Sequence, residues 1–126
     1  MDGERSLDIT AGKARVGIID VGSNSIRLVV YERASRAPLP VFNEKVLCGL
    51  ARGLDATGRL NPEGVEMALA NIDRFTTLAH NMKVTSLDLL ATAAVRDAAD
   101  GADFMRELAS RPGIKPHIVS LSLIHI

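Results

Sequence analysis

The alternation of apolar and polar positions predicts that the chain opens as three consecutive strands. Residues 15–20 form a short, nearly continuous apolar run, which is typical of a strand covered on both faces. The small polar residues at 22–25 indicate a tight turn, and residues 26–31 complete a hairpin. After a proline-containing break, residues 41–50 predict a third strand, and residues 51–60 predict a loop.

The clearest periodicity in the chain predicts a helix over about residues 62–81. Asn61 suits the N-cap, Pro62 the first helical position and Glu63 the positive end of the helix dipole. Apolar side chains then recur at helical spacing, which indicates a buried face: Val65, Ala68, Leu69, Ile72, Phe75, Leu78, Ala79 and Met82.

Three further elements complete the pattern. They are a strand at 85–91, a short helix that carries Phe104, Met105 and Leu108, and a last strand from Ile118 onward. Pro112 ends the short helix because proline cannot continue it. The order β-β-β-α-β-α-β predicts an α/β fold with a mixed five-stranded sheet, part of it parallel.

Composition supports one domain with an aliphatic core. The 126 residues suffice for one core, and 47% of them are hydrophobic but only 3% aromatic. Residues 1–13 lack periodicity and predict a flexible leader, so the domain is expected at 14–120. Cys48 is the only cysteine, which favours a buried thiol in a reducing compartment.

Charge and hydropathy restrict the possible partners. Fifteen basic and fifteen acidic residues give no net charge, so any phosphate site must be built locally and nucleic-acid binding is not expected. No apolar run is long enough for a secretory signal or a membrane span. We therefore expect a cytoplasmic protein without a membrane partner.

The turn after the first strand carries the most informative chemistry. Asp20 stands at the end of a predicted buried strand, and Gly22, Ser23, Asn24 and Ser25 follow. Glycine allows close backbone approach to a ligand, and successive turn amides can form an anion-binding concavity. Asp20 could hold a divalent cation directly or through water. The alternative is an ordinary hairpin turn, because the same residue types are common in turns.

Three segments together resemble one protein family. Residues 20–28 (DVGSNSIRL), 44–54 (EKVLCGLARGL) and 90–98 (LATAAVRDA) are similar, in order and spacing, to the exopolyphosphatase / guanosine pentaphosphate phosphatase family. The similarity extends from about Val16 to about Val119. It implies a ribonuclease H-like half-domain of the actin-like ATPase, sugar kinase and Hsp70 superfamily.

The resemblance also implies an activity and a site. Members release terminal phosphate from inorganic polyphosphate or the 5′ phosphate of guanosine pentaphosphate, use Mg2+, and tend to form homodimers. By position, Asp20 would serve the metal, and Arg96 would bind phosphate together with Gly22, Ser23, Asn24 and Ser25. Arg27 is implied less strongly, because that position varies among members. A surface ion pair with Asp97 is the alternative role for Arg96.

The sequence departs from the family near its carboxyl end. The family's catalytic glutamate follows the strand that would end near Ser120, but residues 121–126 contain no acid and Glu107 is the last carboxylate side chain. We therefore expect an inactive amino-terminal fragment, with residues 121–126 as a non-native tail. Two alternatives stay open: an ATP-dependent kinase of the same superfamily, and a non-catalytic phosphate-binding module.

Overall fold

The computed structural model describes residues 14–32, 39–111 and 113–118. Within them the elements are β1 (Arg15–Val21), β2 (Ser25–Glu32), β3 (Pro40–Leu47), α2 (Leu54–Thr57), α3 (Pro62–Asn81), β4 (Val84–Ala91), α4 (Ala93–Asp97), α5 (Gly101–Ala109) and β5 (Lys115–Ile118). The predicted leader at 1–13 and the predicted tail at 121–126 lie outside the described residues.

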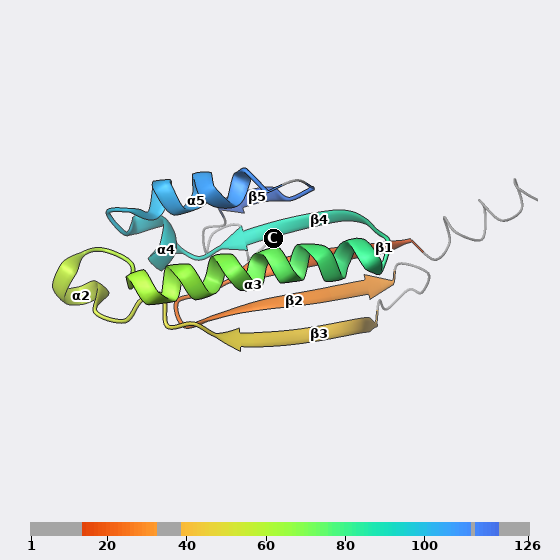
Figure 1. Ribbon diagram of the computed structural model, residues 1–126, viewed down its shortest axis with the longest axis horizontal. Coiled ribbons are helices and arrows are strands. Elements are labelled where there is room, and N and C mark those ends of the chain that lie inside the picture. Colours follow the sequence, from red (N-terminus) through yellow and green to blue (C-terminus); the bar gives the residue numbers. More distant parts are fainter. Residues whose placement is uncertain (1–13, 33–38, 112, 119–126) are drawn as a thin grey trace, which may run out of the picture.

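The strands form a mixed sheet in the order β3-β2-β1-β4-β5 (Figure 1). β2 pairs antiparallel with both β1 and β3, whereas β4 runs parallel to β1 and to β5. The predicted element order lacked α2 and α4, because helices of four and five residues are too short to show a helical period. The third strand also ends at Leu47 rather than at residue 50.

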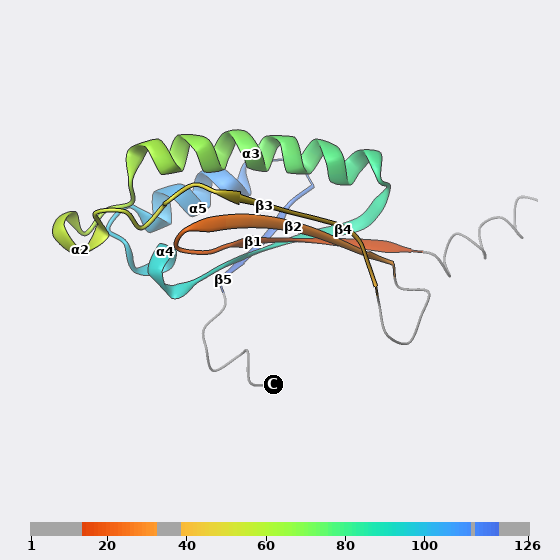
Figure 2. The same cartoon turned by 90° about the horizontal axis from the view of Figure 1, so that it is seen from below.

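Helices α3 and α5 lie on the same face of the sheet, and the core forms between them and the strands (Figure 2). Phe75 and Ile72 of α3 are fully buried there with Ile19 of β1. Within the described part no helix covers the other face, where Ile18 is half-buried and Asp20 exposed. The prediction that the first strand is covered on both faces is therefore wrong for the described part. A continuous apolar run shows only that both faces carry apolar side chains.

The start of α3 corrects one further prediction. Asn61 occupies the N-cap position and Pro62 follows it, but the Asn61 side chain makes no capping bond. Its Nδ2 instead donates to the carbonyl of Gly49 at 3.2 Å. The loop after β3 passes this close because residue 64 is glycine: a Cβ there would lie 2.6 Å from the Cys48 carbonyl oxygen. The helix start is thus joined to that loop.

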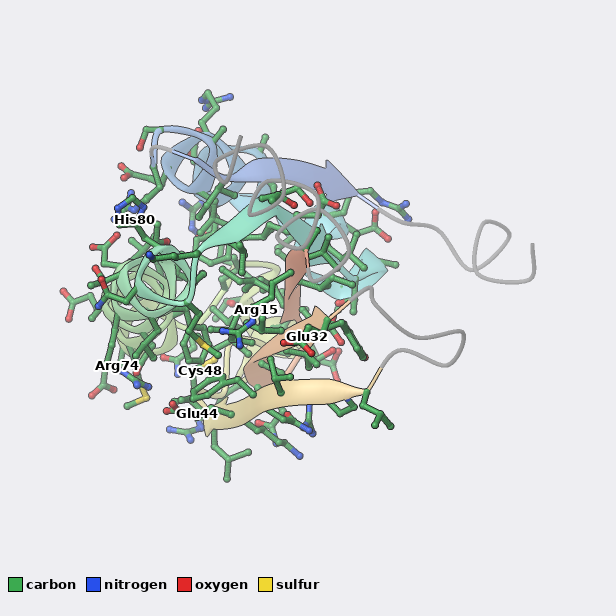
Figure 3. The ribbon with its side chains drawn as sticks, turned by 90° about the vertical axis from the view of Figure 1, so that its right-hand side faces the viewer. Arg15, Glu32, Glu44, Cys48, Arg74 and His80 are labelled. Carbon is green, nitrogen blue, oxygen red and sulfur yellow. The ribbon has the colours of Figure 1, made fainter. Side chains whose placement is uncertain are left out.

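Ion pairs connect the layers and strands along the surface (Figure 3). Arg74 on α3 pairs with Glu44 on β3, and hydrogen bonding by that guanidinium lowers the pKa of the carboxyl. Arg15 on β1 pairs with Glu32 on β2 at 3.3 Å and also donates to the Met82 carbonyl. No helix in the part that the structure describes is long and apolar enough to cross a membrane.

Candidate functional site

The predicted site residues gather where the parallel strands β1 and β4 end. The backbone N–H of Thr92, just after β4, donates to the carbonyl of Val21 at 3.1 Å. The β1–β2 turn and α4 consequently lie at the same end of the sheet (Figure 2). Ligands of open α/β sheets bind outside the carboxyl ends of the strands. The fold therefore brings the segments around Asp20 and Arg96 together at the expected edge.

The carbonyl groups of the turn at residues 22–25 accept hydrogen bonds that fix the conformation of the turn. The Gly22 N–H donates to the Ser25 carbonyl at 2.8 Å, yet neither Ser23 nor Asn24 has the positive φ of a tight hairpin turn. The Ser23 carbonyl accepts from the Ala51 amide at 2.8 Å, and the Asn24 carbonyl accepts from two amides at 3.0 Å, those of residues 48 and 49. This contact, which we call the 48–51 brace, was missed from the sequence.

Two amide groups of the same turn are not used inside the described part of the fold. The N–H groups of Ser23 and Asn24 make no hydrogen bond with any described residue, and both residues are exposed. Because the carbonyls of Ser23 and Asn24 are occupied and their amides are not, the turn presents donors to its surroundings. Such an arrangement suits an anion.

Gly22 is not required by the fold itself. Its φ is not in the left-handed region, and a Cβ at this position would meet nothing closer than the Ser25 carbonyl oxygen at 3.4 Å. A side chain would fit within the described structure. The glycine therefore keeps space clear on the outside of the turn, as close approach by a ligand requires.

Asp20 and Arg27 face each other across β1 and β2 but do not pair. They are register partners, yet Arg27 Nη1 donates to Asn43 Oδ1 at 2.6 Å, which directs it toward β3. The exposed Asp20 carboxylate has no partner among residues 14–32, 39–111 and 113–118. The structure thus leaves Asp20 available at the site and engages Arg27 elsewhere.

A magnesium ion at this turn would find one carboxylate ligand, that of Asp20. The described residues contain no cluster of three or more His, Cys, Asp or Glu that could hold a metal. Mg2+ keeps several waters and binds through one or two carboxylates plus substrate phosphates. Asp20 alone therefore fits a magnesium ion that arrives with, and is largely held by, a phosphate ligand.

Arg96 is exposed on α4, and the ion pair considered from the sequence is present. Its Nε donates to Asp97 Oδ1 at 3.0 Å. Its two Nη atoms have no partner in the described part of the chain. An arginine offers five N–H donors, so the pair with Asp97 leaves donors for a phosphate. The two roles of Arg96 are compatible.

Thr92, which was not among the predicted site residues, lies at the same edge of the sheet. Its Oγ1 is buried and has no hydrogen-bond partner among the residues that the structure describes. The residue lies between Ala91, which ends β4, and α4, at the edge where the turn of β1 and β2 also lies. Its place within the Ala-Thr segment at a strand end was the signal that could have identified it.

Cys48 confirms the prediction of a buried thiol. It is 6% exposed, and burial raises its pKa. Its backbone amide belongs to the 48–51 brace. Cys48 therefore contributes to the site through its main chain, and its side chain belongs to the core.

Comparison with known proteins extends this picture. The sequence profile of the Ppx/GppA phosphatase family matches residues 29–121. Exopolyphosphatase 1 of Mycobacterium tuberculosis is 32% identical over 103 residues, covering 80% of this chain and 30% of that protein. Exopolyphosphatase 2 of the same species is 36% identical over 93 residues, covering 68% and 28%. A structure of the Aquifex aeolicus Ppx/GppA phosphatase superposes with a TM-score of 0.80 at 23% identity, covering 86% of this chain and 36% of that one.

The chain belongs to the Ppx/GppA phosphatase family. The solved Ppx/GppA structures share the overall fold of this chain, and membership of the wider actin-like superfamily stays a prediction. The chain spans about 30% of the length of the curated relatives it matches.

Proposed function

We propose that this chain supplies a phosphate-binding half-site to a hydrolase of phosphoanhydride bonds. The substrate class is inorganic polyphosphate, from which the enzyme releases terminal phosphate, or guanosine pentaphosphate, from which it releases the 5′ phosphate. One observation carries the proposal. In a chain of a phosphatase family, the unused amides of Ser23 and Asn24, the unpartnered Asp20 carboxylate and the spare donors of Arg96 gather at one sheet edge.

Each residue has a distinct part in binding. The turn amides donate to non-bridging phosphate oxygens and fix the position of the terminal group. Arg96 adds charged donors in a fork, which suits phosphate geometry. Asp20 orients a water or a cation at the mouth of the site. When bound, Mg2+ would supply neutralising charge for the phosphate oxygens.

Hydrolysis needs more than this half-site. The carboxylate base and the opposing phosphate loop that the family resemblance implies have no counterpart among the described residues, and the chain spans about 30% of its curated relatives. A half-site can bind phosphate but cannot surround the transition state. We therefore propose that the 126-residue chain binds without turnover, and that the complete gene product hydrolyses.

Calorimetric titration of the chain with tripolyphosphate, with and without Mg2+, tests the binding half of the proposal. Arg96→Gln should weaken binding about tenfold, the usual value of a hydrogen bond to a charged group. Arg106→Gln is the matched control, because Arg106 is an exposed arginine on α5 and pairs with Asp103. Equal affinity of the wild-type chain and Arg96→Gln would remove Arg96 from the site.

The catalytic half is tested on the complete product of the gene. Magnesium-dependent phosphate release from polyphosphate or guanosine pentaphosphate is the expected result. ATP-dependent phosphate transfer to an acceptor, without hydrolysis of either substrate, would instead identify a kinase. Binding without any turnover would identify a phosphate-binding module.

A further inference from the structure

Thr92 carries a polar atom that the fold does not explain. Oγ1 is the only buried side-chain nitrogen or oxygen in the described part that lacks a hydrogen-bond partner. More than nine-tenths of buried polar groups in proteins are hydrogen-bonded, because an unmade bond costs the full desolvation of the group. An unsatisfied hydroxyl at the edge of a candidate site therefore calls for a partner from outside the described chain.

Helix capping does not account for this hydroxyl. Thr92 is the N-cap of α4, where a threonine side chain ordinarily accepts from an amide of the first turn. The backbone has the extended conformation usual for an N-cap (φ −77°, ψ 168°), but no side-chain capping bond forms. The Thr92 main chain is fully engaged, since its N–H donates to Val21 and its carbonyl accepts from Arg96. Only the hydroxyl is left over.

The position of Thr92 connects the two parts of the phosphate site. Its main chain bonds on one side to the residue that precedes Gly22 and on the other side to Arg96. The residue is partly exposed although Oγ1 is buried. Threonine has three staggered χ1 positions, so rotation about one bond can exchange the buried and exposed groups on Cβ.

We propose that the Thr92 hydroxyl is a ligand-contacting group of the phosphate site. When phosphate binds, the side chain turns about χ1, and Oγ1 donates a hydrogen bond to a non-bridging phosphate oxygen. This inference rests on the proposed function, because it concerns the same site. It adds a residue that positions the phosphate between the turn after β1 and Arg96.

Two substitutions separate this role from a structural one. Thr92→Val keeps the branched shape and removes the hydroxyl, whereas Thr92→Ser keeps the hydroxyl. Loss of a bond to a charged ligand should weaken tripolyphosphate binding about tenfold in Thr92→Val. Thr92→Ser should stay close to wild type. The melting temperature of Thr92→Val should be unchanged or higher, because an unsatisfied polar atom is removed. Thr76→Val is the control, since its hydroxyl donates to the Ile72 carbonyl within α3.

The possible outcomes are distinct. If Thr92→Val binds tripolyphosphate as tightly as the wild-type chain does, this inference is overturned and the proposed function stands. If Thr92→Val melts at a lower temperature than the wild-type chain, whatever its affinity, the hydroxyl serves the fold, and the inference is overturned in that case too. A wild-type chain that binds no tripolyphosphate would refute both proposals. Weaker binding at unchanged or higher stability, restored by Thr92→Ser, supports a ligand contact.

Discussion

The two ends of the hairpin formed by β1 and β2 differ in how they treat polar groups. At the end away from the turn, Arg15 bonds both the Glu32 carboxylate and the Met82 carbonyl. At the turn, the Asp20 carboxylate and the Thr92 hydroxyl are left without partners in the described part of the chain. Water solvates the exposed Asp20, but the buried Thr92 hydroxyl costs stability, so a fold that needed only stability would not leave that hydroxyl unpaired. The hairpin thus has a closed end, where polar groups are paired, and a turn end, where polar groups are available to a ligand.

Close backbone packing supports the segments at the turn end of the hairpin. Glycine allows backbones to touch there, with Gly64 packed on the Cys48 carbonyl and Gly101 on the carbonyl of Val95. These contacts fix two segments: the loop after β3, which holds the site turn through the 48–51 brace, and α4, which carries Arg96. The open donors therefore sit on rigid supports.

The largest expected effect comes from Gly101→Ala. A Cβ there would lie 2.1 Å from the Val95 carbonyl oxygen and 2.9 Å from that of Arg96, so the start of α5 must move away from α4. We expect a loss of about 3 kcal/mol in the free energy of unfolding, measured with urea. Gly22→Ala is the matched control, because its nearest contact is an ordinary 3.4 Å. Similar losses in both variants would contradict the distinction between Gly101, which is packed against backbone, and Gly22, which has space beside it.

A smaller effect should appear as the pH is raised through the titration of Cys48. Burial raises the pKa of this thiol in the folded chain above its unfolded value. The stability that this shift contributes is fully present below the unfolded pKa, about 8.5, and is lost as the pH rises through the folded pKa. The free energy of unfolding should therefore fall more steeply above about pH 8.5 in the wild-type chain than in Cys48→Ala. Parallel curves would show that Cys48 does not contribute.

The smallest effect is expected at the closed end. Arg15→Gln removes an ion pair whose side chains are 36% and 34% exposed, and such pairs contribute about 0.5 kcal/mol. Tripolyphosphate affinity should not change, because this end is remote from the turn. A clear loss of affinity in Arg15→Gln would show that the two ends are coupled.

Local patterns were sufficient to predict much of the fold. The helical period located α3 at Pro62–Asn81, and its predicted apolar face is buried or partly buried. The sequence placed Asp20 at a strand end, whereas Arg96 was assigned through the family resemblance; the parallel pairing of β1 with β4 brings both segments to one edge. The prediction of α3 depends on information that is present within a short window of sequence.

The short helices α2 and α4 were missed because they are too short to show a period, and the other main failures involve contacts between distant segments. The Asn61 side chain bonds to Gly49 instead of capping its own helix, because the loop after β3 happens to pass there. The unsatisfied Thr92 hydroxyl can be recognised only when all its neighbours are known. That phosphate and Mg2+ bind at this edge stays a prediction, as do the assigned roles of the turn residues.

The 48–51 brace has a consequence for how mutations at the site should be tolerated. It holds the turn through main-chain amides alone, so the hydrogen bonds do not depend on the side chains of the segment, although Cys48 and Leu50 are themselves buried in the core. Proline is the exception, because it has no N–H to donate. Gly49 is a second exception, since its φ of 62° disfavours other residues. Substitution of exposed side chains along this segment should therefore leave the turn in place, whereas a single proline would remove one of the bonds that hold it.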